Sequence, residues 1–199
     1  MKTTCHNSPL AGKRVAVLVA DGFEQEELTS PINALREAGA ETVIVSPNED
    51  KVRGWKHTKW GRKFKVDLRL AEANAADFDA LVLPGGLMNP DELRRNQHAL
   101  NFVRAFFAVG KPVAAICHGP WTLIDAGVVQ GRRMTSYASI QTDLKNAGAR
   151  WVDEEVVVEN GLVTSRKPDD LPAFNTRLIE VIAESVRATA AYEPSAKAA

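Results

Sequence analysis

Residues 112–120 read Pro-Val-Ala-Ala-Ile-Cys-His-Gly-Pro, a short apolar run that stops at a cysteine. Four apolar residues after a proline predict a buried strand, and the Gly-Pro pair followed by Trp-Thr-Leu-Ile predicts the start of a helix. Cys117 then lies at a tight turn, which needs small residues two positions on either side, and Ala115 and Gly119 meet that need. We therefore predict a nucleophile elbow whose helix N-terminus favours the Cys117 thiolate. The alternative is a buried, inert thiol, which is common among free cysteines.

The composition of the chain predicts one soluble domain without a strongly charged partner. Its 199 residues include 25 Lys and Arg and 25 Asp and Glu, so the formal net charge is zero. This balance argues against specific nucleic-acid binding and against an anionic membrane, although residues 51–67 combine several lysines with Trp55 and Trp60 in a hairpin-like pattern. No apolar run approaches the length of a membrane span.

The two cysteines of the chain help to predict the cellular compartment of the protein. Cys5 lies in a polar leader, residues 1–12, that lacks the apolar segment of a signal peptide. We therefore expect a cytoplasmic protein without a disulfide between Cys5 and Cys117. The expected organisation is a disordered leader over residues 1–12, a single domain over residues 13–187 and a flexible, small and polar tail over residues 188–199.

Hydrophobic patterning predicts strands that alternate with helices. The expected strands cover residues 14–20, 42–46, 78–83 and 113–116, and the expected helices cover residues 24–38, 97–109 and 170–186. Strand-helix-strand units of this length pair in parallel with a right-handed crossover. Asn160-Gly161, between two short apolar runs, predicts a late β-hairpin. The whole pattern predicts one α/β sandwich.

Two further groups of residues fall at the sheet edge that carries Cys117, where open parallel sheets bind ligands. Gly85 and Gly86 follow a strand, and their unobstructed N–H groups, with that of His118, are suited to an oxyanion hole. Glutamates 24, 26 and 27 follow the first strand, where acidic residues also stabilise a helix start. A carboxyl directed at Cys117 would have a raised pKa and could share a proton with it. Spacing alone does not decide which glutamate this is.

His118 is the candidate base, yet sequence neighbours on regular structure do not face each other, so its contact with Cys117 depends on the distortion of the elbow. The other histidines, His6, His57 and His98, are expected at the surface. Cys, His and carboxylate residues do not occur at metal-ligand spacing, so we expect no metal site.

Four motifs carry a family resemblance: Asp-Gly-Phe-Glu-x-x-Glu at residues 21–27, Leu-Pro-Gly-Gly at 83–86, Ala-Ile-Cys-His-Gly-Pro at 115–120 and Thr-Ser-Arg-x-Pro-x-Asp-Leu at 164–171. Together they resemble the DJ-1/PfpI superfamily, and specifically its PfpI, intracellular protease I-like branch. The resemblance extends from about Lys13 to Val186. It implies a flavodoxin-like three-layer sandwich with a mostly parallel central sheet, related to class I glutamine amidotransferases and assembled as a homodimer or larger homo-oligomer.

The resemblance also implies roles for single residues. Cys117 is similar to the reactive cysteine of the family, Glu27 to the glutamate that hydrogen-bonds its sulfur, and His118 to the histidine that follows it. In the PfpI branch an acid from a neighbouring subunit orients this histidine. Asp91 occupies the corresponding stretch, with Glu92 as its rival, and Glu24 and the two glycines are assigned to oxyanion and substrate binding.

The activities that the resemblance implies lead to three hypotheses. The first is a cysteine enzyme that needs no cofactor and acts on small carbonyl compounds or glycated adducts, as a glutathione-independent glyoxalase or a deglycase in stress protection. The second is an intracellular cysteine peptidase of the PfpI type with the same nucleophile. The third is a non-enzymatic redox-sensing stress protein or chaperone, because a low-pKa thiolate oxidises readily. Glutamine amidotransfer is disfavoured because residues 165–168 contain no histidine.

Overall fold

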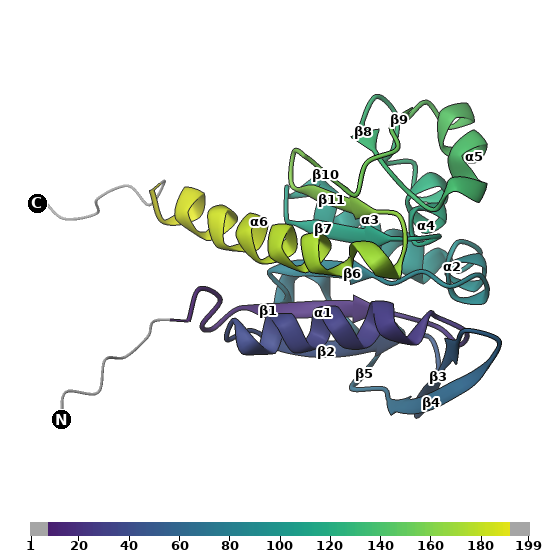
Figure 1. Ribbon diagram of the computed structural model, residues 1–199. Coiled ribbons are helices and arrows are strands. Elements are labelled where there is room, and N and C mark those ends of the chain that lie inside the picture. The colour runs from purple at the N-terminus through teal and green to yellow at the C-terminus, as the bar shows by residue number, and fades with distance from the viewer. Residues whose placement is uncertain (1–7, 192–199) are drawn as a thin grey trace, which may run out of the picture.

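The computed structural model of the chain describes residues 8–191 and contains a seven-stranded sheet between two layers of helices (Figure 1). The strands of this sheet are β1 (Arg14–Leu18), β2 (Glu41–Ser46), β5 (Leu68–Arg69), β6 (Ala80–Leu83), β7 (Val113–Ile116), β10 (Val156–Glu159) and β11 (Leu162–Ser165). Their order is β10-β11-β7-β6-β1-β2-β5, and only β10 and β11 pair antiparallel. The predicted α/β class with a mostly parallel sheet is therefore confirmed.

Side chains that alternate along the strands pack against different helix layers. The helices are α1 (Gln25–Glu37), α2 (Met88–Leu93), α3 (Gln97–Ala108), α4 (Pro120–Asp125), α5 (Gln141–Asn146) and α6 (Leu171–Ala191), with short 3-10 turns at Leu70–Glu72, Ala75–Asp77, Ala138–Ile140 and Pro168–Asp170. Val15 and Val17 of β1 pack in one core cluster with α1 and α6, whereas Ala16 and Leu18 pack in a second cluster with α3. Fully buried strands in a parallel sheet read as continuous apolar runs for this reason. None of the helices in residues 8–191 has the length and hydropathy needed to cross a membrane.

Two small sheets lie outside the central one. One is the hairpin of β3 (Lys51–Lys56) and β4 (Lys59–Lys65), which the sequence predicted, and the other pairs β8 (Arg133–Met134) with β9 (Arg150–Trp151). The predicted late hairpin is β10 and β11. Its turn residues Asn160 and Gly161 both have positive φ, at 49° and 78°, as a type I′ turn requires.

The packed part of the chain extends past both expected domain limits. Leu10 is fully buried and its N–H donates to the Ala38 carbonyl at 2.9 Å, so the segment before Lys13 belongs to the domain from residue 8 onward. At the other end, α6 continues to Ala191, into the expected tail. The rest of the expected leader and tail lies outside the described residues.

A buried amide joins the ends of the central strands. Asn89, in α2, is fully buried; its Oδ1 accepts the Ala20 N–H at 2.7 Å, just after β1. Its Nδ2 donates to the carbonyl oxygens of Pro84 at 2.8 Å and Gly85 at 3.1 Å, just after β6. One side chain therefore holds two strand-end loops together and satisfies three backbone groups that would otherwise be buried without partners.

We predict that Asn89→Ala destabilises the protein by about 3 kcal/mol, because the three backbone groups that Asn89 satisfies would stay buried without a hydrogen-bond partner. Urea unfolding followed by circular dichroism measures this change. Asn101→Ala is the matched control, since Asn101 is exposed on α3 and, within residues 8–191, bonds only to side chains of its own helix. Equal stability of the two variants would contradict this role for Asn89.

Candidate active site

Cys117 follows β7 in a strained, left-handed conformation. Its φ is +61°, and its N–H donates to the Ser165 carbonyl of β11 at 3.1 Å. A Cβ on Gly119 would come within 2.5 Å of the Leu83 carbonyl oxygen, so a side chain there would collide with the neighbouring strand. Positive φ in a non-glycine residue is uncommon, and it redirects the cysteine out of the line of the strand. The sequence therefore builds the elbow that the apolar run ending at Cys117 predicted.

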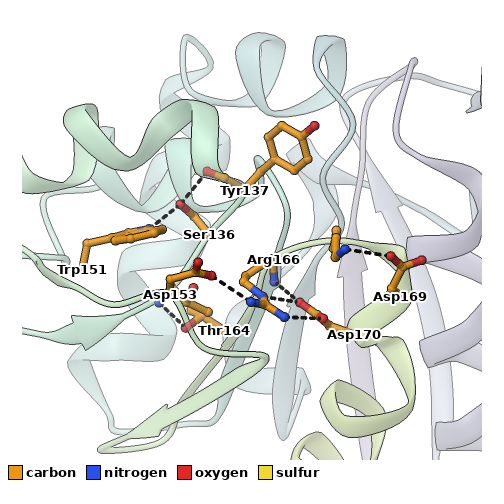
Figure 2. A network of polar contacts seen from close by, with 10 residues as sticks. Ser136, Tyr137, Trp151, Asp153, Thr164, Arg166, Asp169 and Asp170 are labelled. Atoms are coloured by element: carbon orange, nitrogen blue, oxygen red, sulfur yellow. Dashed lines mark hydrogen bonds and ion pairs between the residues drawn. The ribbon is translucent and has the colours of Figure 1, made fainter.

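Arg166, just after β11, is held between two carboxylates (Figure 2). The Arg166 guanidinium binds the buried Asp170 carboxylate through two nitrogens, at 2.9 and 3.0 Å, and binds Asp153 at 2.8 Å. The Arg166 N–H also donates to Asp170, at 3.0 Å. A forked pair of this kind has fixed geometry, so it holds Ser165, the partner of Cys117, in place.

Glu27 is the glutamate that the structure directs at the cysteine. It is fully buried in the first turns of α1, and its Oε2 accepts the Gly85 N–H at 2.8 Å. Burial raises the pKa of Glu27 to about 8, although the Gly85 N–H bond acts in the opposite direction. The carboxyl group is therefore protonated at neutral pH. Glu24 is only half-buried at the start of α1, and burial raises its pKa as well.

The two predicted oxyanion glycines have different surroundings. The Gly85 N–H is bonded to Glu27, so in this geometry it positions the carboxyl group and is not free for a ligand. The N–H groups of Gly86 and His118 are directed at the Cys117 sulfur, where they favour negative charge. Gly86 has a φ of +74°, and a Cβ there would lie 2.6 Å from the Glu24 nitrogen, so only glycine fits.

The surroundings of the sulfur favour the neutral thiol, which contradicts the expectation of a resting thiolate. Cys117 is 7% exposed; burial raises the pKa of its thiol, and the neighbouring Glu27 carboxyl raises it further. The N–H groups of Gly86 and His118 lower it by less. Helix α4 has six residues and starts only at Pro120, so its dipole is too small to offset burial.

The distorted elbow brings His118 onto its sequence neighbour. His118 Nδ1 lies 3.2 Å from the Cys117 sulfur, and Nε2 lies 2.9 Å from the Ser139 hydroxyl oxygen. Burial lowers the pKa of His118, so the ring is neutral at pH 7 and Nδ1 can accept a proton. The ring stacks on Tyr137 with centroids 4.8 Å apart and tilts against Trp121 at 5.3 Å.

Asp91 and Glu92, the candidate acids for orienting His118, are exposed on α2. Within residues 8–191 neither forms a hydrogen bond or ion pair with His118, and Ser139 occupies its outer nitrogen. The same part of the chain holds no group of three or more His, Cys, Asp or Glu residues placed to bind a metal ion. His57 and His98 are exposed, as expected, and His6 lies outside the described residues.

Sequence reasoning missed several residues of the site. Ser139 and Tyr137 lie in an irregular segment about twenty residues after the elbow, on the 3-10 turn and just before it, where no periodicity marks them. The backbone gives the physical link: the Tyr137 N–H donates to the Cys117 carbonyl at 2.9 Å. This hydrogen bond holds the segment with Tyr137 and Ser139 against the elbow. The contact joins positions far apart in sequence, so it can be found only from the fold.

The fold and site define a class of protein: a parallel α/β sandwich with a cysteine on a strand-to-helix elbow, flanked by a histidine and a buried glutamate. The chain belongs to the DJ-1/PfpI family, whose family model matches residues 13–181. It is 46% identical over 172 residues to protein/nucleic acid deglycase 2 of Escherichia coli, covering 85% of this chain and 98% of that protein.

Two other similarities extend this comparison. The chain is 44% identical over 173 residues to general stress protein 18 of Bacillus subtilis, covering 86% of this chain and 98% of that protein. Among solved structures, Drosophila melanogaster DJ-1beta superimposes with a TM-score of 0.79 at 30% identity, covering 90% of this chain and 96% of that one. The flavodoxin-like sandwich that the resemblance implied is therefore confirmed.

We predict that Ser139→Ala slows alkylation of Cys117 by iodoacetamide about tenfold at pH 7, because the His118 ring loses the contact that orients Nδ1 toward the sulfur. The measurement follows thiol loss by mass spectrometry, with Cys5→Ala as the background so that one thiol remains. Ser139→Thr retains the hydroxyl group and should restore the rate. Thr142→Ala, at a nearby exposed position, is the control. If all variants react alike across pH 6 to 9, Ser139 does not position His118.

A second prediction concerns stability and follows from the raised pKa of Glu27. Between pH 4.5 and 8 the folded protein keeps the Glu27 proton while the unfolded chain has lost it, so the free energy of unfolding falls as the pH rises, by up to about 1.4 kcal/mol per pH unit from this group. Glu27→Gln removes the effect. Urea midpoints measured from pH 5 to 8 should therefore fall more steeply for the wild type than for Glu27→Gln. Glu26→Gln is the control, and parallel curves for wild type and Glu27→Gln would refute the assignment.

Proposed function

We propose that the protein is a cysteine-dependent enzyme that removes reactive carbonyl groups, as a glutathione-independent glyoxalase or as a deglycase of glycated adducts, in stress protection. One observation carries this proposal: a single sulfur lies 3.2 Å from a neutral imidazole nitrogen and beside a buried, protonated carboxyl group. This arrangement supplies a nucleophile, a base and an acid at one point. The names of the relatives in E. coli and B. subtilis, a deglycase and a stress protein, support the same function.

The first step uses the neutral thiol. His118 Nδ1 takes the Cys117 proton as the sulfur attacks the aldehyde carbon of a substrate such as methylglyoxal. The C=O electron pair moves to oxygen, where the N–H groups of Gly86 and His118, both directed at the sulfur, stabilise the developing charge. Protonation of that oxygen gives a hemithioacetal. Charge therefore appears only when the substrate is present.

The later steps move protons within the adduct. His118 removes the hydrogen on the former aldehyde carbon, which gives an enediolate, and returns this proton to the adjacent carbon. The hydroxyl group of the hemithioacetal loses its proton to the neighbouring oxygen, with Glu27 as the acid that relays it, so the ketone becomes a secondary alcohol. The sulfur then carries a thioester. Water hydrolyses it to a hydroxy acid such as lactate and regenerates the Cys117 thiol. Glu27 Oε1 is buried and the Glu27 side chain interacts with that of Cys117, so its proton is held beside the sulfur.

We also propose that the protein acts as a homo-oligomer. Leu87 and Met88, at the start of α2, and Tyr137, stacked on His118, expose 60%, 42% and 41% of their surface. A second copy that covers these side chains would remove them from water. It would also bring Asp91 or Glu92 of one copy toward the His118 site of the other, in the role that Ser139 fills within this chain.

The contacts favour enzyme chemistry over redox sensing. A sensor cysteine is typically solvent-accessible and has a low pKa, whereas Cys117 is buried and its pKa is raised. A peptidase would use the same nucleophile but must admit an extended peptide to a sulfur that is 7% exposed. A small carbonyl compound needs much less space than a peptide to reach this sulfur.

We predict that Cys117→Ala abolishes consumption of methylglyoxal and of a glycated lysine peptide, with a loss of at least about a thousandfold, because the covalent adduct cannot form. Lactate release is measured by enzymatic assay, and casein digestion is measured on the same samples to test the peptidase alternative. Cys5→Ala is the matched control and should keep full activity. Undiminished turnover by a folded Cys117→Ala protein would end the proposal, and Cys117-dependent casein digestion without carbonyl turnover would favour the peptidase.

A further inference from the structure

The β3–β4 hairpin has a local excess of positive charge, which the zero net charge of the whole chain does not show. Its 15 residues, 51–65, contain seven Lys and Arg residues and no Asp or Glu, although the chain as a whole is neutral. The ion pairs formed among residues 8–191 include none of these seven cations. The hairpin is therefore a basic surface without an acidic partner in the described part of its own chain.

The register of the hairpin places four cations on one face. Lys51 pairs with Lys65 and Arg53 with Lys63, and residues two apart on a strand share a face. The opposite face is inward: Val52 is fully buried, and the residue across from it, Phe64, packs on Phe23. Like charges directly opposite each other destabilise a sheet. A bound anion would relieve this repulsion.

The same basic face contains an exposed indole ring. Trp60 is 42% exposed and lines a hollow of about 310 Å³ with Asp21, Lys51, Val52, Arg53 and Lys63. The Arg53 guanidinium lies 5.4 Å from its ring centroid. The centroid of the Trp55 ring also lies 5.4 Å away, with an angle of 76° between the two ring planes. The one acid in the hollow, Asp21, is engaged by the Arg53 N–H at 2.6 Å. The hollow thus combines a fixed aromatic ring with several cations.

We infer that this basic face, Lys51, Arg53, Trp60, Lys63 and Lys65, docks a single-stranded nucleic acid, with a base stacked on Trp60 and phosphates on the lysines. Single-stranded nucleic-acid sites combine basic grooves with aromatic rings in this way. An acidic peptide would neutralise the lysines but would supply no planar group for the indole. A second copy docked symmetrically on this face would bring four cations against four. This inference differs from the expectation, based on the balanced net charge of the chain, that the protein does not bind nucleic acid specifically.

The hairpin is joined to the loop that borders Cys117. The Gly22 N–H donates to the Arg53 carbonyl at 2.8 Å, and the Trp55 N–H donates to the Phe23 carbonyl at 2.7 Å. The opposite side of this loop is in contact with Gly86. A strand docked on the hairpin therefore lies against the loop that forms one wall of the cysteine site. Binding itself requires none of the chemistry of Cys117, so it stands independently of the proposed activity.

Fluorescence anisotropy of a labelled oligothymidylate of about 15 nucleotides tests the inference on the full-length protein. At about 50 mM salt, Trp60→Ala should weaken binding about tenfold, and Trp60→Phe, which keeps a ring, should recover most of it. Lys51→Gln/Lys63→Gln should reduce the slope of log affinity against log salt by about 1.4. The control Lys145→Gln/Arg177→Gln removes the same charge outside the hairpin and should change neither quantity.

Further measurements separate the alternatives. Cys117→Ala should bind the oligonucleotide like the wild type, and the hairpin variants should keep their circular dichroism spectrum and methylglyoxal turnover. Binding that is insensitive to Trp60, or a polyglutamate peptide that displaces the oligonucleotide equally well from wild type and Trp60→Ala, would overturn the inference in favour of a plain acidic partner. A change of sedimentation coefficient in the hairpin variants would also overturn it, because the face would then contact another copy of the chain.

Discussion

The bond from the Gly85 N–H to the buried Glu27 carboxyl, 2.8 Å long, joins three chain segments that meet at the site. Glu27 comes from the first helix and Gly85 from the loop after β6, and a Cβ on Gly85 would lie 2.7 Å from the Cβ of Cys117. An ionised carboxyl without a counter-charge is unfavourable in such surroundings, so the group keeps its proton. The same burial raises the pKa of the cysteine. The hydrogen bond fixes the position of the carboxyl group, and the burial of this junction keeps the site uncharged.

A site that is neutral at rest has a consequence for its chemistry. Thiol, imidazole and carboxylic acid carry no net charge until a substrate is attacked, and the backbone N–H groups of Gly86 and His118 are already directed at the point where charge appears. Donors fixed by the fold need no reorganisation during the reaction. The strained φ of Cys117 belongs to the same arrangement, because it turns the cysteine out of the strand and lets His118 reach its neighbour's sulfur. Burial also protects the thiol from indiscriminate oxidation.

The sequence predicted those parts of the molecule that short-range rules govern. Apolar runs marked the central strands, Asn160-Gly161 marked a hairpin whose positive φ values follow from those residue types, and small residues around Cys117 marked the elbow. Glu27 was singled out by a motif, since helix spacing alone left three glutamates equal. The roles of Ser139 and Asn89 were not predicted, because their hydrogen bonds to His118 and to the Ala20 N–H join segments that are distant in sequence. The predicted thiolate at Cys117 was wrong because burial raises the pKa of the thiol and outweighs a short helix dipole. Burial is a property of the tertiary fold, which the local sequence does not show.

Net charge shows a related limit, because a sum over the chain says nothing of where charges lie. The hairpin turns an ordinary run of lysines into a single face, since its pleat sends Val52 and Phe64 inward while their neighbours point outward. Phe23 anchors both features: its ring packs on Phe64, and its carbonyl accepts the Trp55 N–H. That phenylalanine lies in the loop that touches Gly86. The packing that orients the basic face is thus also the packing that fixes one wall of the cysteine site.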